Sequence, residues 1–204
     1  MKMTPNTPQP PRFPQWAAVL MLLMLVALSA CQQRVSEPPP EDMNFYEAPE
    51  GLFSLYYPDG FNEPRAIGKV LGEETYIITT PDKKGSVVIG IGLDDESPSD
   101  DVWSESVSRP DLARTIGQSI LLDQWDEYSR DIDSEARTVR IEVGSEEAGM
   151  HGNMWLEESE GIMMVIVWAA PDDQADQYQP QIDTLIRTFA WEPATVRAVL
   201  ARQE

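Results

Sequence analysis

Eight consecutive residues near the end of the chain, Ile162 to Ala169 (IMMVIVWA), are all apolar. A short, β-branched run of this kind is typical of a strand that is buried on both faces, in the middle of a sheet. The segment before it, Met150 to Glu157, is expected to pair with it as a hairpin around Ser159-Glu160-Gly161. The chain is therefore predicted to build a sheet whose central strand is covered on both sides.

Further strands and two helices follow from apolar periodicity. Strands are expected at residues 52–57, 66–71, 75–80, 86–93 and 137–144, with a last short strand at 189–191. A first helix is expected from about Arg109, with Leu112, Ile116 and Ile120 on its apolar stripe. A second helix follows Pro171, and because of Pro180 its main part is expected to start near Gln179. These elements predict an α+β fold: an antiparallel sheet flanked by two main helices, as an α/β/α sandwich.

The first 30 residues have the parts of a secretory signal. Lys2 and Arg12 precede an apolar run from Trp16 to Leu28. Its 13 residues have the length of a signal-peptide core and are too few to span a bilayer comfortably, which takes about 20. The run leads directly into Cys31, which is the only cysteine in the chain.

Leu28-Ser29-Ala30-Cys31 resembles the lipobox of bacterial lipoproteins. That resemblance implies cleavage before Cys31 and acylation of its thiol, so the expected location is extracytoplasmic, on a bacterial cell membrane or outer membrane. Attached acyl chains contribute about 0.8 kcal/mol per buried CH₂, which suits permanent anchoring when two or more chains are present.

Four segments are expected. Residues 1–30 are the signal peptide, and residues 31–44 are the lipidated cysteine with a tether, which Pro38 to Pro40 stiffen. Residues 45–192 are the globular domain, and residues 193–204 are a short terminal helix or tail.

The mature chain is strongly acidic. The whole chain has a formal net charge of −20; without Lys2 and Arg12, 13 basic and 35 acidic residues leave a net of −22. This balance argues against nucleic acid as a partner, because affinity for phosphate depends on Lys and Arg. It also argues against electrostatic docking on anionic lipid.

The two ends of the domain resemble PsbP-like domains. Residues 51–61 (GLFSLYYPDGF) match their opening pattern of Phe, apolar residue, Tyr-Pro and Phe, and residues 178–191 (YQPQIDTLIRTFAW) match their closing tyrosine–helix–Ser-Phe pattern, with Thr188 at the serine position. The resemblance covers residues 45–192 and implies the PsbP-like fold. Members of that group bind other proteins, but the matching residues are core and turn residues, so no role transfers residue by residue.

No catalytic set and no established metal site can be assigned. His151 is the single histidine and is expected to be an ordinary strand residue. Gly90-Ile91-Gly92 lacks the third glycine of a dinucleotide fingerprint. Among the tryptophans that could line a ligand groove, Trp103 and Trp125 are the better candidates for exposure, because they flank the first predicted helix. A candidate weak cation loop consists of acidic residues: Asp94, Asp95, Glu96, Asp100 and Asp101.

The expected function is a membrane-anchored surface lipoprotein that acts as a non-enzymatic protein-binding or assembly module, without a cofactor. Its partners would be the membrane, through the acyl chains on Cys31, and an unidentified protein. A small-ligand or calcium-binding lipoprotein is one alternative. A hydrolase with an unrecognised carboxylate site is another.

Overall fold

The computed structural model describes residues 41–70, 73–93, 100–119 and 125–202. The predicted lipobox and Cys31, most of the tether, and Asp94, Asp95 and Glu96 of the predicted cation loop lie outside these residues. No helix within the described ranges is both long and apolar enough to cross a membrane.

Seven antiparallel strands form the main sheet, in the order β3-β4-β5-β9-β8-β7-β6. A separate hairpin pairs two more strands, β1 and β2. The strand bounds are β1 Met43–Glu47, β2 Ser54–Pro58, β3 Arg65–Val70, β4 Glu73–Thr79, β5 Ser86–Leu93, β6 Asp126–Asp133, β7 Thr138–Ser145, β8 Met150–Ser159 and β9 Ile162–Pro171. The helices are a 3₁₀ turn at Pro49–Gly51 and α2 Asp100–Val107, α3 Leu112–Ser119, α4 Asp172–Thr188 and α5 Pro193–Leu200.

The apolar run at 162–169 lies in β9, the middle strand of the sheet, as predicted. Its alternate residues face opposite sides. Ile162, Ile166 and Trp168 enter one core, whereas Val167 and Ala169 enter another.

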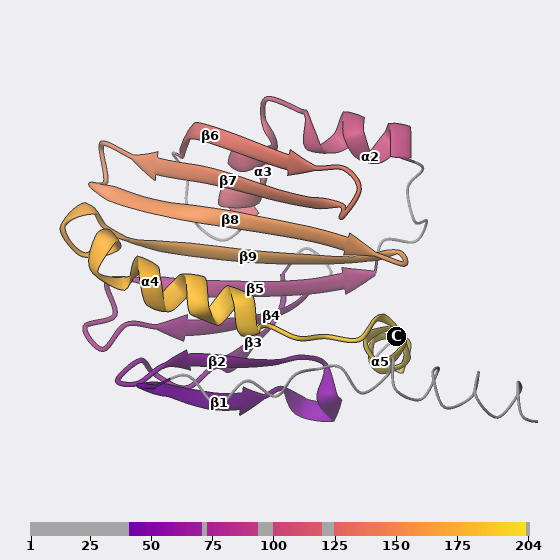
Figure 1. The fold of residues 1–204 in the computed structure, drawn as a ribbon, viewed down its shortest axis with the longest axis horizontal. Coiled ribbons are helices and arrows are strands. Elements are labelled where there is room, and N and C mark those ends of the chain that lie inside the picture. The colour runs from indigo at the N-terminus through magenta and orange to yellow at the C-terminus, as the bar shows by residue number, and fades with distance from the viewer. Residues whose placement is uncertain (1–40, 71–72, 94–99, 120–124, 203–204) are drawn as a thin grey trace, which may run out of the picture. The chain divides into compact units, whose positions relative to one another are not determined.

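Two apolar cores lie on opposite faces and opposite halves of the sheet. The first core lies between β4, β5 and β9 on one side and the β1–β2 hairpin, α4 and α5 on the other. The second lies between β7, β8 and β9 and the pair α2–α3. In Figure 1, α4 crosses the front of the sheet and α3 lies behind it. The predicted antiparallel sheet flanked by helices is therefore confirmed, and the two layers are offset, so that the described helices cover mainly one half of each face.

The helices differ from expectation in two places. Asp100 and Asp101, expected in a loop, are the first two residues of α2, a helix that was not predicted from the sequence. The second helix is one continuous element that passes through Pro180. Pro180 and Asp176 are both exposed, so water can hydrogen-bond the Asp176 carbonyl that loses its helical donor.

Trp103 and Trp125, the two candidates for exposed tryptophans, are both buried, at 1% and 4% exposure. Trp103 and Val107 are four residues apart on α2 and both enter the second core. That spacing places them on one face of a helix, which covers apolar surface.

The ends of the domain pack on the first core. Strand β1 begins at Met43, two residues before the expected start of the domain. Val196, Val199 and Leu200 of α5 are buried in the core. The short strand expected at 189–191 is only a single bridge between Ser54 and Ala190.

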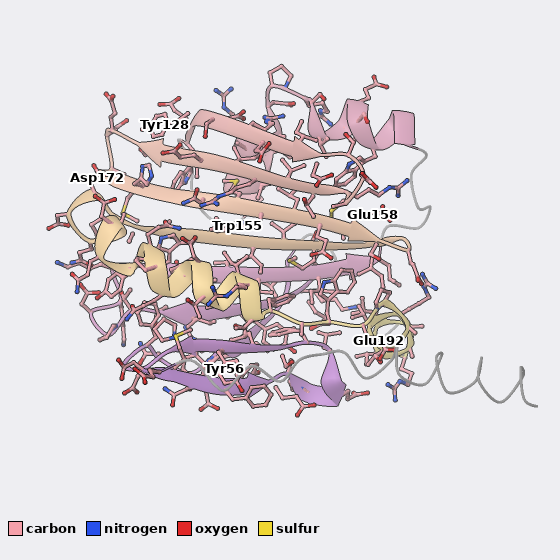
Figure 2. The ribbon with its side chains drawn as sticks, in the orientation of Figure 1. Tyr56, Tyr128, Trp155, Glu158, Asp172 and Glu192 are labelled. Carbon is pink, nitrogen blue, oxygen red and sulfur yellow. The ribbon has the colours of Figure 1, made fainter. Side chains whose placement is uncertain are left out.

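The β8–β9 hairpin turns at Glu160-Gly161, as predicted, and both residues have positive φ, 53° and 77°. Beside this turn Glu158 is 2% exposed. Its carboxylate pairs with the Arg137 guanidinium from the β6–β7 turn and accepts the Gly161 N–H at 2.8 Å. This ion pair joins the two hairpin turns at one end of the sheet, the end where Figure 2 places Glu158.

Glu73 gives a prediction about pH. Its side chain lies against the backbone of Gly90 and Gly92, and desolvation raises the pKa of its carboxyl group. A raised carboxyl pKa means that the neutral form is favoured in the folded state, so the stability from this group is present below its unfolded pKa and is lost as the pH rises through its folded pKa. Glu73→Gln should therefore raise the melting temperature more at pH 8 than at pH 5, as measured by thermal unfolding. An equal or larger gain at pH 5 would contradict this.

Candidate functional site

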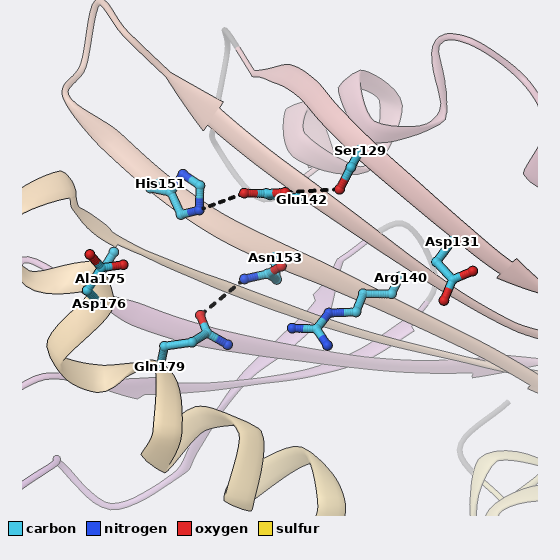
Figure 3. A pocket seen from close by; sticks show the side chains of 9 residues that line it. All are labelled: Ser129, Asp131, Arg140, Glu142, His151, Asn153, Ala175, Asp176 and Gln179. Atoms are coloured by element: carbon cyan, nitrogen blue, oxygen red, sulfur yellow. Dashed lines mark hydrogen bonds and ion pairs between the residues drawn. The ribbon is translucent and has the colours of Figure 1, made fainter.

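Within the described part of the chain, no helix covers most of the polar side of strands β6, β7 and β8, and α4 borders it. The apolar residues of these strands, among them Val139, Ile141 and Met154, point to the second core on the other side. Their alternate residues face the side on which α4 lies. There they line a pocket of about 380 Å³ against the N-terminal half of α4 (Figure 3), named here the strand-face pocket: Ser129, Asp131, Arg140, Glu142, His151, Asn153, Ala175, Asp176 and Gln179.

Strand register arranges these side chains in two rungs across the sheet. Ser129, Glu142 and Asn153 are register partners on β6, β7 and β8. Asp131 and Arg140 pair in the same way in the next rung, which continues into Trp155. Directly opposed side chains on one face lie about 5 Å apart, so each rung is a row of interacting groups.

Glu142 is held in place by both of its neighbours. The Ser129 hydroxyl donates to its Oε2 at 3.0 Å, and His151 Nε2 lies 3.4 Å from its Oε1. The predicted exposed or hydrogen-bonded strand position of His151 agrees with this arrangement. The carboxylate is thus oriented before any ligand binds.

The wall formed by α4 has its own network. Gln179 accepts a hydrogen bond from Asn153 Nδ2 at 3.2 Å and donates to Asp183 at 2.8 Å. The Arg140 guanidinium lies 5.4 Å above the Trp155 ring centroid and 3.7 Å from Asp183. These contacts direct the pocket's arginine toward α4 and Trp155.

Tyr128 marks one end of the pocket. The register shifts between Glu127 and Ser129, so Tyr128 is the extra residue of a β-bulge. Its ring lies over Gly144, where a Cβ would be 2.7 Å from it, and stacks on His151 at 6.0 Å between centroids. Figure 2 shows Tyr128 and the start of α4, at Asp172, at the same end of the sheet.

The surroundings of Tyr128 are acidic. Desolvation raises the pKa of the Tyr128 hydroxyl, and nearby carboxylates raise it further: Glu146, Asp126, Asp172 and Glu142. A phenolate would be repelled by these charges, so the hydroxyl stays neutral and the local potential is negative.

The arrangement lacks the pairing that nucleophilic catalysis needs. A serine nucleophile is activated when its hydroxyl donates to a base such as histidine. Here Ser129 donates to Glu142, and His151 approaches the same carboxylate from the other side. The polar groups of the strand-face pocket therefore position one another.

The candidate site predicted from the sequence consisted of other residues than those of the strand-face pocket. Of the predicted cation loop, only the backbone of Asp100 and Asp101 lies within the described residues, in α2. No group of three or more His, Cys, Asp or Glu side chains suited to a metal ion occurs in the described part of the chain. The calcium alternative therefore stays a prediction.

Neither a protein-family profile nor a curated protein matches this sequence. Solved structures do match. The cyanobacterial PsbP protein (CyanoP) of Synechocystis is 12% identical, covers 79% of this chain and 99% of its own, and superposes with a TM-score of 0.57. The domain has a PsbP-like fold. This agrees with the resemblance of residues 51–61 and 178–191, and at this identity it concerns the fold alone.

Two other structures match the PsbP-like domain less well. A Bacteroides thetaiotaomicron protein is 15% identical, with 74% of this chain and 49% of that chain covered and a TM-score of 0.41. A Pseudomonas aeruginosa protein of unknown function is 12% identical, with 74% and 98% covered and a TM-score of 0.44.

Proposed function

We propose that this protein is an extracytoplasmic lipoprotein, anchored through Cys31, whose PsbP-like domain is a non-enzymatic binding module. We assign the strand-face pocket as its binding site. The observation that carries this assignment is the uncovered polar half of the sheet. Its hydrogen-bonding side chains are fixed by one another and by α4, without a nucleophile–base pair.

The size of the pocket favours a small group as its occupant. About 380 Å³ lies at the lower end of the range of small-molecule sites, roughly 300–1,000 Å³. A pocket of this volume accommodates one side chain of a partner protein. A small free ligand is the second candidate, since the same volume accommodates it equally.

The edge of the sheet next to the pocket is unsuited to pairing with another strand. Strand β6 is the edge strand, and its sequence DEYSRDID is mostly charged and exposed. Charged edge strands discourage addition of a strand from another chain. A protein partner would therefore bind through side chains in the pocket.

A photo-crosslinking experiment in the native cell tests the binding role. A photoreactive amino acid at Tyr128, which is 50% exposed at the end of the pocket, should give reproducible adducts. The matched control position is Ile67, which is 46% exposed on β3. Adducts at neither position, or the same adducts at both, would count against the strand-face pocket as a binding site.

The anchor gives a separate prediction. Cys31→Ala should abolish incorporation of labelled fatty acid, because a single cysteine leaves no second thiol to acylate. The domain should still fold, since about 150 residues bury a sufficient core without an anchor. Fatty-acid labelling followed by membrane fractionation measures the first expectation, and thermal unfolding measures the second. Equal labelling of the Cys31→Ala protein would show that the lipoprotein assignment is wrong.

A further inference from the structure

The strand-face pocket holds a hydrogen-bond acceptor that lacks a donor. Asn153 is 6% exposed, and its Nδ2 donates to Gln179. Its Oδ1 accepts no hydrogen bond from any residue within the described ranges. Since Glu142 is its register partner on β7, this amide oxygen lies beside a carboxylate. Two adjacent acceptors of this kind match a ligand that carries several N–H donors.

The charges of the pocket point to the same kind of ligand. Arg140 is its one guanidinium, against the carboxylates of Asp131, Glu142 and Asp176. Arg140 is engaged by Trp155 and Asp183. Asp131 lies opposite Arg140 in the strand register, but its carboxylate and that of Asp176 form no side-chain hydrogen bond or ion pair with another described residue. The pocket therefore has an excess of negative charge that its own side chains leave uncompensated.

The end of the pocket near Tyr128 adds an aromatic surface. The ring is half exposed and stacks on His151. Aromatic faces attract organic cations, and guanidinium groups in particular pack flat against them. The Glu142 carboxylate and the Asn153 amide line the pocket, and the Tyr128 ring borders it through its contact with His151.

We propose that the strand-face pocket binds an organic cation, a guanidinium or ammonium group. Its N–H groups donate to the Glu142 carboxylate and to Asn153 Oδ1, and Asp176 on α4 supplies further negative charge. This proposal rests on the proposed function, because it names the ligand chemistry of the same pocket. The cation can be a free small amine or an arginine or lysine side chain of a partner protein.

Isothermal titration calorimetry on the full chain, held in neutral detergent, tests this with defined probes. Agmatine represents the free small cation, and an acetylated Gly-Arg-Gly amide represents a protein side chain. The control is the same tripeptide with citrulline, which has nearly the shape of arginine without its charge. Losing one charged hydrogen bond lowers affinity by about tenfold or more, so the citrulline peptide should bind at least about tenfold more weakly than the arginine peptide.

Variants then locate the site. Glu142→Gln should weaken cation binding by about tenfold. Glu135→Gln makes the same charge change in the exposed β6–β7 turn and should leave affinity within about twofold. Arg140→Gln removes the competing cation and should strengthen binding, and this second variant keeps the test valid if Glu142→Gln alters the fold.

The outcomes separate the two proposals. Binding of agmatine alone supports a free small cation, and binding of the arginine peptide as well supports a protein side chain. Equal binding of the citrulline peptide, no binding of either cation, or weaker binding by Arg140→Gln would overturn the cation proposal. If position 128 still crosslinks a partner in that case, the binding module stands and only its ligand chemistry is wrong.

Discussion

Arg137→Ala should destabilise the domain by about 3–5 kcal/mol, because it leaves the buried Glu158 carboxylate without its cation. The Glu158 carboxylate still accepts the Gly161 N–H, which carries no full charge. The substitution removes the side-chain link between the β6–β7 and β8–β9 turns and leaves the backbone hydrogen bond from the Glu158 N–H to the Arg137 carbonyl. Urea unfolding followed by circular dichroism measures the change.

The matched control for this prediction is Arg140→Ala. Arg140 lies on β7, three residues after Arg137, but its side chain is 52% exposed and its ion pair with Asp183 is long, at 3.7 Å. Exposed pairs contribute about 0–1 kcal/mol, so the control should change stability little. Adding Glu158→Gln to Arg137→Ala should recover part of the lost stability. Similar losses for Arg137→Ala and Arg140→Ala would refute the role assigned to burial.

Gly152→Ala should destabilise the domain by about 3 kcal/mol or more, at or beyond the upper end of what overpacking costs. A Cβ at this position would lie 2.0 Å from the Trp168 carbonyl oxygen and 3.0 Å from the Ala169 Cα. Both atoms are backbone of β9, so the two central strands would have to separate. The expected result is a large drop in melting temperature, with loss of near-ultraviolet circular dichroism if packing is disrupted.

Gly90→Ala is the control for this second prediction. Gly90 is also a buried glycine within a strand, and an added Cβ would lie 2.3 Å from Glu73 Oε2. That neighbour is the end of a flexible side chain, which can move at small cost. The destabilisation should be less than half of that caused by Gly152→Ala. The reverse order would mean that Glu73 is held more firmly than the β8–β9 backbone.

The strands and helices that were predicted well from the sequence are those that have an apolar residue pattern on one face or on both faces. Apart from Ser86, residues 86–93 are apolar or glycine, and they form β5 at the expected bounds. The second predicted helix is present and buries Ile182 and Leu185, which lie three residues apart on one face. Apolar periodicity reports burial, so it locates the strands and helices that enclose the two cores.

The elements that the sequence missed carry little apolar periodicity. Strand β6, with the sequence DEYSRDID, has only Tyr128 and Ile132 as apolar residues, because an edge strand has no second neighbour and one open face. Helix α2 is short, and its Trp103–Val107 pair is a weak signal next to an acidic run. In both β6 and α2 only some of the residues are buried, so apolar periodicity locates these two elements poorly.

The strand-face pocket was also missed, although a signal for it exists. Arg140 and Glu142 on β7, and His151 and Asn153 on β8, are polar residues that alternate with buried apolar ones. This alternation is typical of any strand that has one solvent-exposed face. Only the sheet order and the placement of α4 show that Gln179 and Asp176 close over it, and these depend on pairing between distant parts of the chain.

The make-up of the first core sets the order in which the chain can fold. That core combines residues 48–91 with residues 162–200, and β5 pairs on its inner side with β9. Non-local pairings of this kind form late, since the loop between them must close first. A chain that emerges with its N-terminus first can pair β5 with β4, but β5 has no second neighbour until β9 follows, and the β1–β2 hairpin has no cover until α4 follows. If the leader directs export as predicted, this delay keeps the first core open until the last forty or so residues leave the ribosome, so that this part of the chain can still thread through a translocation channel.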